Sequence, residues 1–101
     1  MELRFLAPAE AELLEAITYY NGESEGLGYE FATEVQRTLV RIASHPNAWA
    51  PISKHTRRCR MSRFPYGLLY QLRPDVILIV AVMHLHRDPE SWKKRLSPGR
   101  T

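Results

Sequence analysis

The sequence predicts an α+β fold, because it divides into a helical first half and a strand-rich second half. Between residues 8 and 44 apolar residues recur every three or four positions, which is the period of an amphipathic helix. After residue 56 the chain becomes a series of short segments rich in β-branched and aromatic residues, separated by turns that contain Pro or Gly. At 101 residues the chain has the size of one domain, which we expect to span residues 1–101.

The first half predicts a short strand followed by a hairpin of two helices. Residues 2–6 alternate polar and apolar side chains, as a strand does. Pro8 suits the first turn of a helix, which we expect to end at Asn21-Gly22. Ser24 is the expected N-cap of a second helix that runs to Ser44, before His45-Pro46 ends it. The short connection makes the two helices antiparallel neighbours.

Both predicted helices carry one apolar stripe that should pack on the sheet. We expect the stripe to face the sheet, with Leu13, Ile17, Phe31, Val35 and Leu39 buried against residues 76–82. Its members are Leu13, Leu14, Ile17 and Tyr20 in the first helix, and Leu27, Phe31, Val35, Leu39 and Ile42 in the second.

The second half predicts three strands and a short terminal helix. Residues 47–56 are expected to be a loop, followed by strands over 57–63, 66–73 and 76–85. Short turns join these strands, so they should form an antiparallel meander, with the helices on one face. Residues 76–85 are apolar on both faces, which predicts a central strand. Asp88-Pro89-Glu90 resembles a helix start, and 97–101 should be a frayed end.

Charge is divided unevenly between the two halves. Residues 1–50 hold eight acids and three bases, a balance of −5, whereas residues 51–101 hold eleven bases and three acids, a balance of +8. This asymmetry indicates an acidic or polyanionic partner for the basic half. The start of the chain has no secretory pattern, and its longest apolar run is too short to span a bilayer, so we expect a cytoplasmic protein.

Few residues in the sequence could hold a metal ion or a cofactor. The lone Cys59 excludes an internal disulfide and a zinc site built from cysteines. The spacing of His84 and His86 suits a metal ion, but no third ligand lies nearby in the sequence. We therefore expect neither metal nor cofactor.

The order of elements, together with a set of aromatic and basic residues, resembles the ParE/RelE toxin superfamily from Ala7 to Arg95. The marks are Tyr19-Tyr20, Leu27-Gly28 with Phe31, Pro46 with Trp49, Arg57-Arg58, Phe64-Pro65-Tyr66 with Tyr70, and His84-Leu85-His86-Arg87-Asp88-Pro89 with Trp92 and Arg95. The last two groups are the more specific ones. The chain looks closest to the ParE-like toxins of type II toxin–antitoxin systems, also known as plasmid stabilisation proteins.

The resemblance implies a β-α-α-β-β-β fold with a short C-terminal helix, in which a two-helix hairpin packs on a small antiparallel sheet. It also implies a ParD-like, DNA-binding antitoxin as partner, in a hetero-oligomeric complex. ParE-like members poison DNA gyrase, while RelE-like members cleave mRNA on the ribosome without a metal ion. Fold analogy alone does not choose between these targets.

The residues favour a gyrase-binding toxin over an enzyme. The RelE-like pattern has a functional Tyr in its C-terminal tail, whereas this chain has no Tyr after Tyr70 and carries Trp92 there instead. Indole cannot act as an acid or base at neutral pH. The alternative is an endoribonuclease in which arginines bind phosphate and imidazoles transfer protons. Its candidate residues are Arg60, His84, His86 and Arg87. An inactive binding homologue is the second alternative.

Six residues are expected to contact the target or the antitoxin. Each has a plainer interpretation: the arginines can form a solvated face, and Trp92 can cap the sheet. His84 can likewise be a core residue, and Tyr66 and Tyr70 should pack under the helices. The expected binding residues are Arg58, Arg60, Arg63, Arg87, Trp92 and Arg95.

Overall fold

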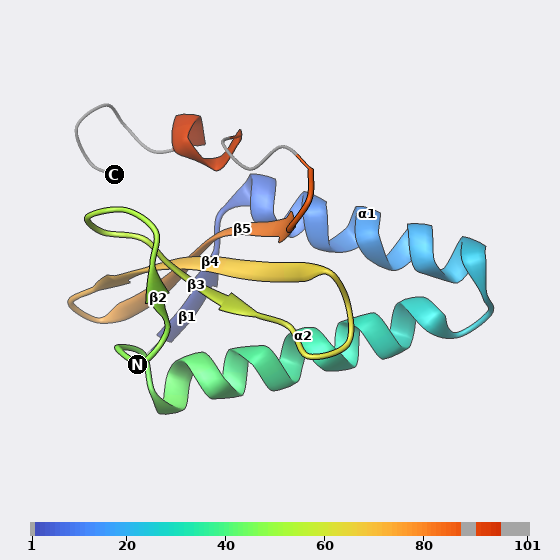
Figure 1. Cartoon of the computed structure of the whole chain (residues 1–101), viewed down its shortest axis with the longest axis horizontal. Coiled ribbons are helices and arrows are strands. Elements are labelled where there is room, and N and C mark those ends of the chain that lie inside the picture. Colours follow the sequence, from blue (N-terminus) through green and yellow to red (C-terminus); the bar gives the residue numbers. More distant parts are fainter. Residues whose placement is uncertain (1, 88–90, 96–101) are drawn as a thin grey trace.

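The computed structural model describes residues 2–87 and 91–95 of the chain. A helical hairpin covers one face of a five-stranded sheet, and a short 3-10 helix lies on the other side of the sheet (Figure 1). The predicted α+β arrangement is therefore confirmed. The elements in order are β1 (Glu2–Phe5), α1 (Ala7–Glu23), α2 (Leu27–Ser44), β2 (Ala50–Pro51), β3 (Arg57–Arg60), β4 (Tyr66–Arg73), β5 (Val76–His84) and the 3-10 helix η1 (Ser91–Arg95).

The sheet is mixed, with strand order β1-β5-β4-β3-β2. β1 runs parallel to β5, pairing Glu2 with Val76 and Phe5 with Ile79, while all other neighbours are antiparallel. The predicted antiparallel meander is confirmed for β3, β4 and β5, and β1 adds a parallel strand at the edge of the sheet. A four-residue strand carries no local signal for its partner or direction, which are set by the packing of α1 on β5.

The second half follows the prediction closely, with two local differences. β5 lies between β1 and β4, so the prediction of a central strand is confirmed. β3 ends at Arg60 rather than residue 63, because the chain turns back and the Met61 N–H donates to the Tyr66 carbonyl oxygen at 2.9 Å. The predicted loop 47–56 contains the two-residue strand β2, whose Pro51 is tolerated because this strand forms an edge of the sheet. The helix start predicted at 88–90 and the frayed end at 97–101 lie outside the described residues.

The turn between the helices differs from its prediction. Ser24 ends α1 instead of starting α2, and its N–H donates to the Tyr20 carbonyl oxygen at 3.0 Å. Gly26 precedes α2 with φ 85°, a left-handed conformation that favours glycine. Gly28 then lies so close to α1 that an added Cβ would stand 2.2 Å from the Ile17 carbonyl oxygen. The two helices can approach this closely only because residue 28 has no side chain.

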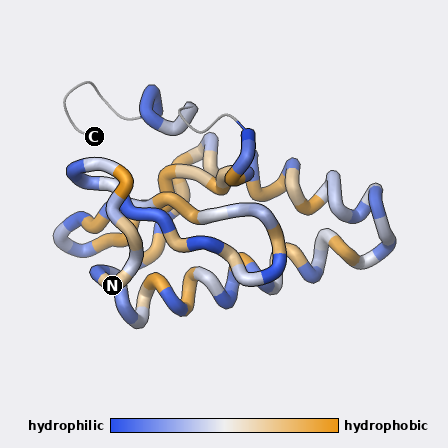
Figure 2. The backbone as a smooth tube through the Cα atoms, viewed as in Figure 1, coloured by the Kyte–Doolittle hydropathy of each residue, from blue (hydrophilic) through white to orange (hydrophobic). Residues whose placement is uncertain are grey.

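The main core lies between the helices and the sheet and is rich in aromatic rings. Phe31 stands at its centre, with ring centroids 5.0 Å from Tyr66 and 5.1 Å from Phe64. Tyr66 and Tyr70 are both buried on this side, as predicted. In Figure 2 hydrophobic and hydrophilic residues alternate along the two helices, whereas β3 and several loops are largely hydrophilic. Among the described helices, none is long and apolar enough to cross a membrane.

Most members of the predicted apolar stripe pack against the core, as expected, but Leu14 does not. Phe31, Val35 and Ile42 are buried. Leu14 is 58% exposed, because it lies on the side of α1 that faces away from the sheet. The remaining members are half-buried and pack against the core: Leu13, Ile17, Tyr20, Leu27 and Leu39.

Candidate functional site

An irregularity in β5 decides which side chains share a face of the sheet. Leu69 of β4 pairs with Ala81 and the next residue, Tyr70, pairs with Ile79, so Val80 has no partner on β4. Such a β-bulge inserts one unpaired residue, so that the alternation of side chains between the two faces of the sheet shifts by one position. Before the bulge Ile77 and Ile79 face the helices; after it Val82 does, and His84 pairs with the helix-facing Tyr66. The residues after the bulge therefore lie on the opposite face of the sheet from the one that strict alternation would give them.

The face away from the helices carries two of the predicted binding arginines. Arg58 pairs with Leu69 and Arg60 pairs with Gly67, and directly paired residues project to the same side of a sheet. The Arg58 stem lies across Gly67: a Cβ added there would meet Arg58 Cγ and Leu85 Cδ2 at 3.2 Å each. Arg58 Nε is buried and has no hydrogen-bond partner within the described part of the chain. Gly67 thus provides the space in which this arginine lies.

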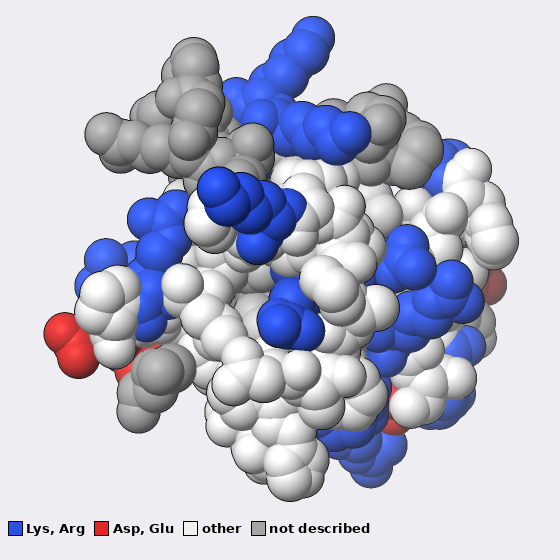
Figure 3. Space-filling view, turned by 60° about the vertical axis from the view of Figure 1, so that its left-hand side comes forward, with Lys and Arg blue, Asp and Glu red and all other residues white. Residues whose placement is uncertain are grey.

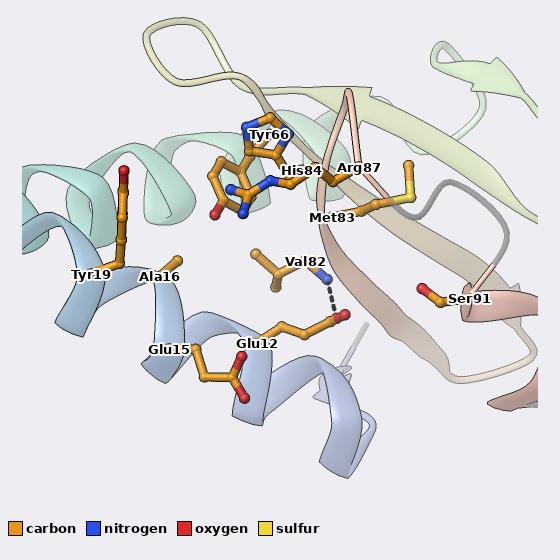
Figure 4. A pocket seen from close by; sticks show the side chains of 10 residues that line it. All are labelled: Glu12, Glu15, Ala16, Tyr19, Tyr66, Val82, Met83, His84, Arg87 and Ser91. Carbon is orange, nitrogen blue, oxygen red and sulfur yellow. Dashed lines mark hydrogen bonds between the residues drawn. The ribbon is translucent and has the colours of Figure 1, made fainter.

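A polar pocket of about 380 Å³ opens between α1 and the end of β5. One wall holds Tyr66, His84 and Arg87, and the α1 wall holds Glu12, Glu15 and Tyr19 (Figure 4).

The ionisation of the pocket follows from burial and from the nearby arginine. Burial raises the pKa of the Tyr66 hydroxyl, and the Arg87 charge opposes this rise. Burial, followed by the charges of Arg87 and His86, lowers the pKa of His84. His84 Nδ1 accepts the His86 N–H at 3.1 Å, so this nitrogen carries no proton. Both the lowered pKa and this contact favour the neutral form of His84, in which Nδ1 is the acceptor.

An ion pair holds the C-terminal turn beside this pocket. Arg95 donates to both carboxylate oxygens of Glu12, at 2.7 and 2.5 Å, across 83 residues of sequence. The same two side chains bind the edge of β5: Glu12 Oε1 accepts the Val82 N–H at 3.0 Å, and Arg95 Nη1 donates to the Val80 carbonyl oxygen at 3.0 Å. We call this arrangement the Glu12–Arg95 clasp. It fills the part of the β5 edge that β1 leaves unpaired.

Two other predicted binding residues have contacts within the fold. Arg63 pairs with Glu30 of α2 at 2.8 Å and lies 5.5 Å from the Phe64 ring centroid. Trp92 is 2% exposed and packs with Val80 and Met83 on the side of the sheet away from the helices, so its interpretation as a cap is confirmed. A binding role for either residue remains a prediction.

Three of the four candidate nuclease residues lie near one another, and Arg60 lies apart from them. His84 and Arg87 line the same pocket, with the exposed His86 ring 5.8 Å from the His84 ring. Arg60 projects from the opposite face of the sheet. Within residues 2–87 and 91–95, no three His, Cys, Asp or Glu side chains lie close enough together to hold a metal ion.

The structure adds two residues that sequence reasoning did not single out. Glu12 lies in α1, and nothing local marks it as the partner of a residue near the other end of the chain. Gly67 follows the Phe-Pro-Tyr turn and reads as a turn glycine. Only the pairing of β3 with β4 shows that it lies under Arg58.

Basic side chains are prominent at the surface on one side of the molecule. Figure 3 shows Lys and Arg side chains bordering an uncharged surface, with few acidic groups in view. Arg60 and Arg87 are exposed, and Arg58 is half-buried. The arrangement suits binding of an acidic or anionic surface more readily than catalysis by a compact set of proton-transfer groups.

The fold is shared with a protein of a toxin–antitoxin system. The chain matches a solved structure described as "Chromosomal ParDE TA system from P. aeruginosa" with a TM-score of 0.74 and 15% identity, covering 84% of this chain and 96% of that one. This likeness establishes the class of fold.

Sequence comparison identifies the family. A family model described as the ParE toxin of the type II toxin–antitoxin system parDE matches residues 3–89. Two proteins named Toxin ParE2, from two strains of Mycobacterium tuberculosis, are each 32% identical over 100 residues, covering 98% of this chain and 94% of theirs. The chain belongs to the ParE toxin family, so the resemblance inferred from its residues is confirmed.

Proposed function

We propose that this ParE-family toxin arrests growth in the cytoplasm by binding DNA gyrase, and that a cognate antitoxin neutralises it. The observation that carries the choice of mechanism is the separation of Arg60 from His84 by the sheet. Metal-free RNA cleavage needs a base, an acid and a cation around one phosphate. A gyrase-binding toxin needs only a shaped surface with accessible cations, which the exposed Arg60 and the half-buried Arg58 supply on the face away from the helices.

Induction of the protein in cells that lack the antitoxin tests this mechanism. Double-strand DNA breaks with intact mRNA support gyrase as the target. His86→Gln is expected to leave growth inhibition nearly intact, because His86 lies outside the pocket and its hydrogen bond to His84 is made by its backbone N–H. Growth without DNA breaks or mRNA cleavage, at a normal level of folded protein, would indicate an inactive homologue.

A pair of substitutions tests the basic face. Arg58→Gln removes a charge, whereas Gly67→Ala keeps every charge and pushes the Arg58 stem and Leu85 away from their positions. Both variants should weaken gyrase inhibition in a supercoiling assay. Arg4→Gln is the matched control, because Arg4 is exposed on β1 at the far edge of the sheet. Equal inhibition by all three folded proteins would argue against this face as the contact.

A ribosome-dependent endoribonuclease is the second candidate, and one observation favours it. His84, Arg87 and Tyr66 share a pocket that could admit a reacting phosphate. If His84 acts as the base, His84→Gln should lower the cleavage rate on the order of 10²–10⁴-fold. Codon-dependent mRNA cleavage on ribosomes, lost in this variant, would replace gyrase with the ribosome as the target.

The antitoxin should meet the basic half of the chain with acidic side chains. Charge pairing of this kind accelerates association and is screened by salt. We expect the association rate of toxin and antitoxin to fall between low and high ionic strength. A rate that does not change with salt would exclude charge-guided association even if the complex forms.

A further inference from the structure

A small polar pocket lies beside the turn between β2 and β3, and we call it the β2–β3 pocket. In Figure 1 this turn lies at the opposite end of the molecule from the turn between the helices. The pocket has a volume of about 180 Å³. Arg57 lines it and pairs with the core-facing Tyr70, so the pocket is separate from the face that carries Arg58 and Arg60. Its other lining residues include Asn47, Ser53, Lys54, His55 and Thr56.

Basic side chains line the pocket without a carboxylate to neutralise them. Lys54, His55 and Arg57 come from the turn and the start of β3. Within the part of the chain that the structure describes, no Asp or Glu lines the pocket, and neither Lys54 nor Arg57 forms an ion pair. A concave site lined by one sign of charge concentrates ions of the opposite sign. The β2–β3 pocket is therefore suited to an anion.

Arg57 is held in place with part of its guanidinium unused. Its Nη1 donates to the carbonyl oxygens of Asn47 at 3.1 Å and Trp49 at 2.7 Å. Among the described residues, these bonds leave the N–H groups of Nε and Nη2 without an acceptor. Two adjacent N–H groups of a guanidinium match two oxygens of one phosphate or carboxylate group. Because the backbone already orients this side chain, binding an anion requires little further ordering.

Ser53 supplies a donor that the fold does not use. It lines the pocket, and its hydroxyl oxygen is buried without a hydrogen-bond partner in residues 2–87 and 91–95. Buried polar groups of proteins are nearly always paired. The neighbouring Thr56 hydroxyl follows this rule, because Gln71 Nε2 donates to its oxygen at 2.9 Å. The unpaired hydroxyl of Ser53 indicates a ligand that accepts hydrogen bonds, as the free edge of Arg57 does.

We propose that the β2–β3 pocket binds a phosphate group of a nucleic-acid backbone through Ser53, Lys54 and Arg57. Sites that enclose a whole small molecule have volumes of roughly 300–1,000 Å³, so this smaller pocket holds one anionic group of a ligand whose remainder lies outside. Among the described residues that line it there is no Phe, Tyr or Trp on which a base would stack. A backbone phosphate fits both conditions, because its sugar and base stay outside the pocket.

Such a site lets the toxin hold nucleic acid that is bound to its target. It does not depend on whether that target is gyrase or the ribosome, since both act on nucleic acid. The contact is also independent of the sequence of the nucleic acid, because phosphate contacts carry no base information.

Fluorescence anisotropy of a labelled DNA duplex, titrated with the purified toxin, tests the pocket. Lys54→Gln should raise the dissociation constant on the order of 10-fold and Ser53→Ala about threefold, because each removes a donor to a charged group. Lys54→Gln should also reduce the slope of log affinity against log salt by about one. The matched controls are Arg4→Gln, on β1 at the opposite edge of the sheet, and the exposed Ser24→Ala. Both should bind within about twofold of wild type.

The melting temperature of Ser53→Ala separates a ligand donor from a structural residue. An unpaired buried hydroxyl is unfavourable, so its removal should leave Tm unchanged or raise it while the affinity for the duplex falls. A variant that loses stability and affinity together would assign Ser53 to the fold and overturn its role in the pocket. Equal affinity of Lys54→Gln, Ser53→Ala and both controls, or a wild type that binds no duplex, would overturn the nucleic-acid site.

Competition distinguishes the possible sources of the anion. Inorganic phosphate and a mononucleotide should displace the duplex only weakly, because each offers a single phosphate contact where the duplex offers several. Tight binding of either one without binding of the duplex, lost in Lys54→Gln, would assign the pocket to a free phosphate compound and overturn the nucleic-acid occupant. Preferential binding of a polyglutamate peptide would assign it to an acidic protein. These measurements contain no gyrase, ribosome or antitoxin, so their failure leaves the proposed function standing.

Discussion

Breaking the Glu12–Arg95 clasp should cost more stability than breaking a surface ion pair. The side chains of Arg95 and Glu12 are only 14% and 27% exposed, and Glu12 also accepts the N–H of the buried Val82. Glu12→Ala removes a charge-assisted contact and leaves that N–H without its acceptor. The combined cost should be about 2–4 kcal/mol, after allowance for the partial exposure of Glu12.

Two further substitutions separate the charge from the hydrogen bond. Glu12→Gln retains an oxygen for the Val82 N–H and loses only the charge, so it should cost about 1 kcal/mol. Glu15→Ala is the control, because Glu15 is exposed on the same helix. In thermal and urea denaturation Glu12→Ala should lower Tm by about 10–25 °C, at roughly 4–8 °C per kcal/mol. A Tm within 2 °C of the Glu15→Ala control would refute the energetic role of the clasp.

Three other expectations concern the core, the helix crossing and the effect of alkaline pH. Phe31→Ala should cost about 3–5 kcal/mol in urea denaturation and the half-buried Leu39→Ala about 2 kcal/mol; equal small losses would contradict the helix register. Gly28→Ala should lower the free energy of unfolding by 1–3 kcal/mol or more, because its Cβ would meet the Ile17 carbonyl oxygen; a wild-type melting curve would show that the helices can move apart. Burial raises the pKa of Tyr70 to about 12, against 10.0 for a free tyrosine. Above pH 10 the unfolded chain therefore loses this proton before the folded chain does, and stability should fall between pH 10 and 12. A Tyr70→Phe variant should lose less stability over that interval, which denaturation at several pH values would measure.

The helices and the central strand could be predicted because each has a local pattern. Phe31, Val35 and Ile42 recur with the helical period and are buried. Residues 76–83 are all apolar, and β5 (Val76–His84) lies within the sheet. Leu14 was misplaced because it is apolar and adjacent to Leu13, so composition alone assigns both to one stripe. Only its exposed position on α1 shows that it belongs to a different surface.

Most of the candidate site could not be predicted, because its geometry depends on pairings distant in the sequence. Arg58 and Arg60 could be placed on one face from the alternation of a strand, and the structure bears this out. The approach of Arg58 to Gly67 follows from the pairing of two strands, and Glu12 meets Arg95 only after the chain has passed through the whole sheet. Nor does any residue in the uniformly apolar run from Val76 to Met83 identify Val80 as the position of the bulge.

The bulge at Val80 links the stability of the clasp to the chemistry of the surface. With strict alternation, His84 would lie on the face opposite Ile77 and Ile79, the same face as Arg60. The extra residue instead turns His84 toward the helices, where it pairs with Tyr66. The bulge is also where the clasp binds, because Arg95 contacts the Val80 carbonyl oxygen and Glu12 contacts the Val82 N–H. Loss of the clasp should therefore loosen the part of β5 that keeps His84 and Arg60 on separate faces. Glu12→Ala is consequently expected to disturb the pocket around His84 as well as the overall stability, whereas Phe31→Ala destabilises the core without acting on the bulge.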